Sequence, residues 1–139
     1  MAIKMRILYA SGKKKVNQIA NEIKAQYELA FNAVDVIPPA YSCDKERIVV
    51  LIVSAKGNVS DSVRLFCREL TKARAQNVAL MIHGDEAAAK NLKDILAEAG
   101  TNVLDEVLYI NVPFFGGSLK PEEKTEIFAW IDRVIANLK

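Results

Sequence analysis

Short apolar runs of strand length alternate with longer amphipathic stretches of helix length throughout this 139-residue chain. The third run, residues 48–53, reads Ile-Val-Val-Leu-Ile-Val and has no polar position, which is typical of a strand covered on both faces. Strands that alternate with helices form right-handed crossover units and hence a parallel sheet. The predicted strands are residues 3–9, 31–37, 48–53, 78–82 and 107–112.

Apolar side chains that recur at spacings of three and four residues predict four helices among these runs. Asn58, Ser60 or Asp61 is placed to cap the second helix. Gly100 is placed to end the third helix, and Pro121 to open the fourth. The apolar stripes of the four helices span residues 16–27, 63–70, 92–99 and 127–138.

The number of strands, and the absence of a helical pattern between the second and third strands, limit the possible folds. Five strands are too few for a (β/α)₈ barrel, so we predict an open parallel sheet with helices on both faces. Residues 38–47 begin with a Pro-Pro pair, which stops the second strand, and we predict a loop or a single turn there. The whole chain, residues 1–139, is therefore predicted to be one α/β domain.

Charge, hydropathy and cysteine content exclude several classes of protein. The net charge of +2 is much smaller than the basic excess typical of nucleic-acid-binding proteins. No apolar run is long enough for a membrane helix, so a membrane protein is not expected either. The two cysteines form no Cys-x-x-Cys pair; Cys67 lies in an apolar helical stripe and Cys43 in a loop. We expect a cytoplasmic monomer or weak dimer without a signal peptide, metal site, nucleic-acid partner or membrane partner.

The carboxyl ends of the strands are the expected location of a ligand site, because open parallel sheets bind ligands where the winding direction reverses. This rule singles out the segments that follow the first, third and fourth strands. They are residues 10–15, 54–60 and 83–86.

The first of these segments carries three lysines at the start of a helix. Lys13, Lys14 and Lys15 stand near the positive end of the helix dipole, where each nearby positive charge costs a few tenths of a kcal/mol. A bound anion would remove this conflict and use the free backbone N–H groups, with Ser11 and Gly12 allowing close approach. Alternatively, the long side chains simply reach water.

The other two segments have local explanations as well. The Gly57-Asn58 pair favours a turn with positive φ, which by itself accounts for the residues after the third strand. His83 is the only histidine, and at a strand end it is more often structural than catalytic. It forms no nucleophile–base pair with Cys43, so we expect no hydrolytic enzyme.

All three segments resemble the corresponding parts of short-chain flavodoxins. Residues 7–20 are similar to the first strand, phosphate loop and first helix of that family. Residues 53–58 are similar to its second flavin loop and residues 78–85 to its fourth strand and third loop, while residues 112–130 follow the rhythm of its last strand and helix. The resemblance implies the strand order 2-1-3-4-5, non-covalently bound FMN and a role in electron transfer.

The resemblance also assigns candidate residues to the cofactor. In flavodoxins the peptide after the residue that matches Lys56 rotates to reach the flavin N5 when the ring is reduced; here Gly57 permits this rotation, and Lys56 favours an anionic reduced flavin. The implied FMN-binding residues are Ser11, Gly12, Lys13, Lys14, Lys15, Val16, Ser54, Ala55, Lys56, Gly57, Asn58, His83, Gly84 and Asp85.

Two departures from the flavodoxin pattern keep a second hypothesis open. The family's phosphate loop reads roughly S/T-x-T-G-N-T, but Lys13, Lys14, Lys15 and Val16 replace all of it except Ser11. The second and third loops also lack the aromatic residues that stack on a flavin. We read Phe114 and Phe115, after the fifth strand, either as substitutes or as core or partner-facing residues.

Three hypotheses for function follow. The first is an FMN-dependent electron carrier rather than an enzyme with its own substrate; its redox partner should differ from those of acidic flavodoxins, because the pI here is about 8.5. The second is a flavodoxin-fold protein that has lost FMN and binds another anion or a protein. The third is an enzyme that uses bound FMN to reduce a small substrate.

Overall fold

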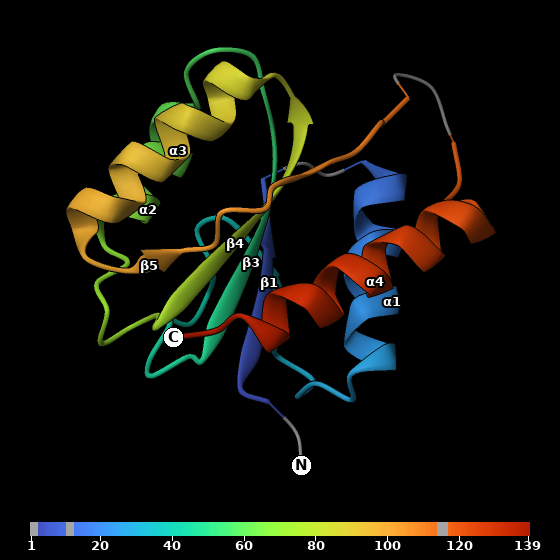
Figure 1. Cartoon of the computed structure of the whole chain (residues 1–139), viewed down its shortest axis with the longest axis horizontal. Helices are drawn as coiled ribbons and strands as arrows, with labels where there is room; N and C mark the ends of the chain where they lie inside the picture. The colour runs from blue at the N-terminus through green and yellow to red at the C-terminus, as the bar shows by residue number, and fades with distance from the viewer. Residues whose placement is uncertain (1–2, 11–12, 114–116) are drawn as a thin grey trace.

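The structure is a computed structural model that describes residues 3–10, 13–113 and 117–139. It is a parallel sheet with helices on both faces (Figure 1). The elements in chain order are β1 (Met5–Tyr9), α1 (Lys14–Gln26), β2 (Val34–Val36), β3 (Ile48–Ala55), α2 (Asp61–Arg68), β4 (Asn77–Gly84), α3 (Glu86–Ala99), β5 (Asn102–Val103), β6 (Leu108–Tyr109) and α4 (Pro121–Ala136). None of the described helices is both long enough and apolar enough to span a membrane.

The strands pair in parallel in the order β2-β1-β3-β4-β5, and β6 also pairs with β4. The longest pairing joins β3 to β4, with Leu51 opposite Leu80, and it places Ala55 opposite Gly84 at the carboxyl ends. The predicted open sheet and its strand order are therefore confirmed.

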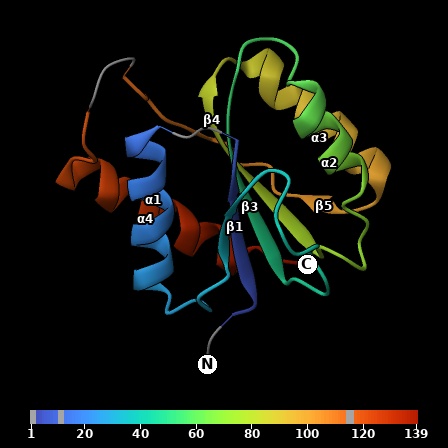
Figure 2. The same ribbon diagram turned by 180° about the vertical axis from the view of Figure 1, so that it is seen from behind.

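The apolar run in β3 feeds two separate cores, because successive side chains of a strand point to opposite faces. Val50 and Ile52 pack on the face that α1 and α4 cover, whereas Val49 and Leu51 pack on the face that α2 and α3 cover. Figures 1 and 2 show these two helix pairs on opposite sides of the sheet. Trp130 of α4 is fully buried in the first core, so it has a packing role.

The fifth strand differs from its prediction, because the run at residues 107–112 forms only the two-residue strand β6. The edge strand is divided into β5 and β6 by a bulge: three positions separate Val78 from Met81 on β4, but five separate their partners Val103 and Leu108. The bulge turns the carbonyl oxygen of Glu106 toward α4, where it accepts a hydrogen bond of 3.1 Å from the Trp130 indole.

Helix ends follow the predicted signals. Ser60 caps α2 through a bond from the Val63 amide, Gly100 ends α3 with φ of 112°, and Pro121 is in the first turn of α4. Residues 38–47 form no helix, as predicted, and Cys43 from this loop is buried in the second core.

Candidate functional site

A cavity of about 440 Å³ lies at the carboxyl edge of the sheet, which is where the topology predicts a ligand site. Its volume is within the range of about 300–1,000 Å³ that is usual for small-molecule sites. No Phe, Tyr or Trp side chain is among the described residues that line it. The lining residues are Ser54, Ala55, Lys56, His83, Gly84, Ile110 and Asn111.

The loop after β3 is tied to the start of α3 by one carboxylate. Gly57 has φ of 73°, as the predicted turn requires, and its N–H donates to Asp85 Oδ1 at 3.0 Å. The same oxygen accepts from the Ala88 amide at 2.9 Å and thereby caps α3. These backbone hydrogen bonds, first that of Gly57 and then that of Ala88, lower the pKa of Asp85. The second and third predicted loops therefore form one hydrogen-bonded unit.

Gly84 is required at the end of β4 for a different reason. A Cβ on this residue would lie 1.7 Å from the carbonyl oxygen of Ala55 on the paired strand. The two strands therefore approach each other here more closely than a side chain would allow, and this contact shapes the bottom of the cavity.

His83 contacts the segment after β6 with one ring nitrogen. Its Nδ1 lies 3.2 Å from the carbonyl oxygen of Ile110 and 3.2 Å from the amide nitrogen of Val112. The ring is half-buried and lines the cavity, so it links the end of β4 to the far wall.

Lys15 holds the same wall from the helix side. The residue is 4% exposed, and its Nζ donates to the Asn111 carbonyl oxygen and to Glu123 Oε2, both at 2.6 Å. The bond from Lys15 is the largest contribution that lowers the pKa of Glu123. Because this ammonium is engaged, the lysines that remain exposed at the start of α1 are Lys13 and Lys14.

The N-terminus of α1 differs from those of the other helices. Within the described residues, Lys13 is its N-cap without a side-chain cap bond, and its first turn has no acidic residue. In α4 the N-cap, Lys120, likewise has no side-chain cap bond, although Glu123 in the first turn accepts from the Lys120 amide at 3.1 Å. By contrast, the side chains of Ser60 and Asp85 cap α2 and α3. An anion near the start of α1 would meet backbone N–H groups that those side chains satisfy elsewhere.

The structure brings together five of the residues that the sequence predicts. Lys56, Ser54, Ala55, His83 and Gly84 line the cavity, whereas Val16 is fully buried in the core beneath α1. Gly57 and Asp85 form the adjoining bonded pair, and Asn58 is exposed beside them. Residues that lie outside the described part of the chain are Ser11, Gly12, Phe114 and Phe115.

Two cavity residues, Ile110 and Asn111, are missing from the predicted site. They follow β6, which pairs with β4, so they lie at the same edge of the sheet as the loop after β4. The rule that ligands bind at carboxyl strand ends applies to the fifth strand as well, and this was the available signal.

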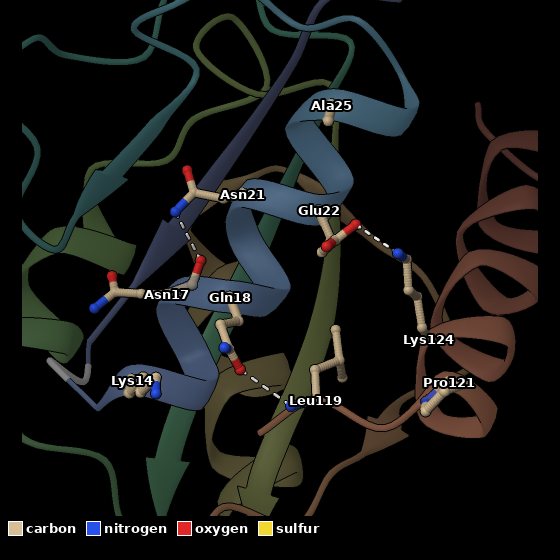
Figure 3. Close-up of a pocket in the computed structure, with 9 residues that line it drawn as sticks. All are labelled: Lys14, Asn17, Gln18, Asn21, Glu22, Ala25, Leu119, Pro121 and Lys124. Carbon is tan, nitrogen blue, oxygen red and sulfur yellow. Dashed lines mark hydrogen bonds and ion pairs between the residues drawn. The ribbon is translucent and has the colours of Figure 1, made fainter. Parts of the chain in front are cut away.

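A larger cavity, about 730 Å³, lies between α1 and α4 rather than at the sheet edge (Figure 3). Gln18 on its wall accepts a hydrogen bond of 3.0 Å from the Leu119 amide, and Glu22 pairs with Lys124 at 2.9 Å. These contacts join the two helices through polar side chains. The position of this cavity does not match the strand-end rule, so we retain the smaller one as the candidate site.

The described residues contain no cluster of three or more His, Cys, Asp or Glu side chains that could hold a metal ion. The geometry instead defines a doubly wound α/β protein whose candidate cavity lies at the carboxyl ends of β3, β4 and β6. Its strand order is that of the flavodoxin-like fold.

Comparison with known proteins agrees with this fold. No family model and no curated protein matches the chain. Among solved structures, a short-chain flavodoxin associated with a non-canonical PDU bacterial microcompartment is similar over 100% of both chains, with a TM-score of 0.71 and 14% sequence identity. The chain therefore has a flavodoxin-like fold, as the resemblance predicts; at this identity the likeness establishes the fold alone.

Proposed function

We propose that this protein binds FMN non-covalently and carries electrons to or from a protein partner, as a flavodoxin does. The observation that carries the proposal is the pairing, at one edge of a flavodoxin-like sheet, of a cationic helix start, to which the described residues give no side-chain cap, with a cavity of cofactor size. Backbone contact supports their proximity, since the amide of Ala10, just after β1, donates to Ile52 of β3 at 3.0 Å.

The residues present suit the two ends of FMN. Lys13 and Lys14 are exposed at the positive end of the α1 dipole, where a phosphate would be held by charge and by backbone N–H groups. Lys56 is the only Lys, Arg, Asp or Glu among the described residues that line the cavity, so the cavity favours an electron-rich ring. Bound FMN would supply the redox chemistry, and the protein would orient the ring and set its electrostatics.

An absorbance spectrum and a fluorescence titration of the apoprotein with FMN test this proposal. We expect saturable quenching with a Kd at or below about 1 µM, equivalent to roughly 8 kcal/mol. Lys14→Glu should weaken FMN binding by at least about tenfold, because it reverses a charge at the start of α1. Lys72→Glu is the matched control: Lys72 is an exposed lysine in the loop before β4, at the opposite edge of the sheet. A protein that leaves FMN fluorescence unchanged contradicts the proposal.

One observation supports an alternative, a flavodoxin-fold protein that binds another anion without FMN. The described cavity lining has no Phe, Tyr or Trp to stack on a flavin, whereas the start of α1, to which the described residues give no side-chain cap, needs only an anion. Under this alternative, inorganic phosphate shifts the amide NMR signals of the first turn of α1, and FMN competes no better than phosphate.

A further inference from the structure

The ring of His83 faces two backbone groups that it cannot satisfy in the same protonation state. Its Nδ1 is 3.2 Å from the Ile110 carbonyl oxygen and 3.2 Å from the Val112 amide nitrogen. A ring nitrogen carries either a proton or a lone pair, so Nδ1 donates to Ile110 or accepts from Val112, but never both. The protonation state of His83 therefore decides which residue of the cavity wall it holds.

Burial decides the arrangement in the neutral ring. Val112 is 3% exposed, and the described residues provide no acceptor for its N–H other than His83 Nδ1. Ile110 is less buried, so its carbonyl oxygen loses less when no donor faces it. A buried N–H without an acceptor is costly, and the neutral ring therefore carries its proton on Nε2 and accepts from Val112.

We propose that His83 is a proton-operated latch on residues 110–112, the wall that the segment after β6 contributes to the candidate site. A proton taken from solvent converts Nδ1 from an acceptor into a donor. The hydrogen bond from Val112 is then lost and a bond to the Ile110 carbonyl oxygen forms, so His83 holds the segment at Ile110 instead of at Val112, while Lys15 still holds Asn111. The effect of this latch on flavin binding rests on the function proposed above. The change of hydrogen-bond partner at His83 does not depend on that function.

The charged groups around residues 110–112 are Lys56, Lys15, Glu123 and Asp85, and we assign the pH response of this wall to His83 rather than to them. The loop after β3 contributes Lys56 to the same cavity, while Lys15 of α1 and Glu123 of α4 hold Asn111 from behind. Asp85, at the start of α3, is engaged by two backbone amides. Histidine is the side chain that ordinarily changes charge between about pH 5 and 8, and the chain has only one.

Nitrogen NMR of the full chain tests the latch without any ligand. Because His83 is the only histidine, every imidazole signal belongs to it. We expect the neutral ring to carry its proton on Nε2, and the Val112 amide signal to move with the same midpoint as the ring. The Val59 amide is the control, since it donates to the uncharged Asn91 side chain at 3.1 Å and should not follow. A neutral ring protonated on Nδ1, or a Val112 signal indifferent to the ring, overturns the proposal.

Riboflavin binding tests the consequence for the site and avoids titration of the FMN phosphate. We expect binding to weaken at least about threefold between about pH 8 and pH 5.5, because the Val112 amide loses its acceptor and the segment after β6 is less preorganised. His83→Gln, which does not titrate in this range, should remove that dependence. A riboflavin affinity that is independent of pH in the unchanged protein refutes control of the site by the latch. If Val112 follows the ring but riboflavin never binds, the latch stands and the flavin proposal fails.

Discussion

Asp85 and Gly57, 28 residues apart in the chain, are joined by a hydrogen bond of 3.0 Å from the glycine amide to the aspartate carboxylate. The same carboxylate oxygen caps α3 through Ala88. One side chain therefore fixes both the turn beside the cavity and the start of the helix behind it.

Replacing this carboxylate should loosen both segments. We expect Asp85→Ala to lower the melting temperature by a few degrees, because α3 loses its N-cap and the Gly57 amide loses its acceptor. Asp85→Asn keeps an acceptor oxygen, so its melting temperature should lie between those of Asp85→Ala and the unchanged protein. Circular dichroism measures the melting temperature, and hydrogen exchange at Gly57 reports the turn. Faster exchange at Ala88 without a change at Gly57 would show that the two segments are not coupled.

The pH dependence of this contribution has a definite sign. The pKa of Asp85 is lowered in the folded protein, first by the Gly57 amide, so the folded state favours the ionised carboxylate. The resulting stability is present above the unfolded-state pKa of aspartate and is lost as the pH falls through the folded-state pKa. We therefore expect the free energies of unfolding of Asp85→Asn and of the unchanged protein to converge in acid. Urea unfolding at several pH values checks this, and a gap that widens in acid would contradict it.

The partly buried ion pair behind the wall should contribute more to stability than the exposed lysine beside it. In the pair of Lys15 with Glu123 the two side chains are 4% and 28% exposed. We expect Lys15→Met to reduce the free energy of unfolding by about 1–3 kcal/mol, since a charged hydrogen bond is lost while the carboxylate keeps partial contact with water. Lys14→Met is the matched control and should change the free energy by no more than about 0.5 kcal/mol. Equal effects in denaturant unfolding would contradict this assignment.

Two glycines near the cavity should differ in how they tolerate a methyl group. At Gly84 the added Cβ meets the Ala55 carbonyl oxygen, so Gly84→Ala should destabilise the protein by about 3 kcal/mol. At Gly57 an added Cβ would meet no atom of a more distant residue within 4 Å. Only the positive φ opposes alanine there, and this should cost about 1–2 kcal/mol. Denaturant unfolding of both variants measures the difference. A larger loss at Gly57 would mean that the strands separate easily at Gly84.

The two thiols should resist modification in the folded protein. Burial raises the pKa of Cys43, and it raises the pKa of Cys67 to about 12. Arg6 is 6% exposed and holds the Cys43 loop by donating to the Tyr41 carbonyl oxygen at 2.6 Å. Because lysine presents a single ammonium in place of the guanidinium fork, Arg6→Lys should speed labelling of Cys43 by at least about tenfold through local opening. Peptide mapping after reaction with a thiol reagent separates the two sites.

Labelling of Cys67 provides the internal reference for that experiment. It lies in α2 and packs in the second core, away from the Arg6 side chain's hydrogen bonds. Parallel acceleration of both cysteines would indicate global destabilisation rather than release of the loop.

Most of the fold was predictable because its signals are local. The apolar run of β3, the Ser60 cap and the Gly100 terminator each act within a few residues of their own position. The division of β5 from β6 was not predictable, because it is defined by pairing with β4, and the Glu106 carbonyl oxygen between the two strands meets the Trp130 indole of a later helix.

The sequence by itself determined the order of the elements, the two buried faces of the sheet and the edge at which ligand loops gather, because hydrophobic periodicity and capping are properties of neighbouring residues. Only the tertiary structure decided the roles of the side chains at that edge. Three adjacent lysines look alike in sequence, yet Lys15 is drawn into a buried pair with Glu123, 108 residues away, while Lys13 and Lys14 stay exposed. His83 likewise obtains its role from Ile110 and Val112, since long-range partners depend on how the chain packs.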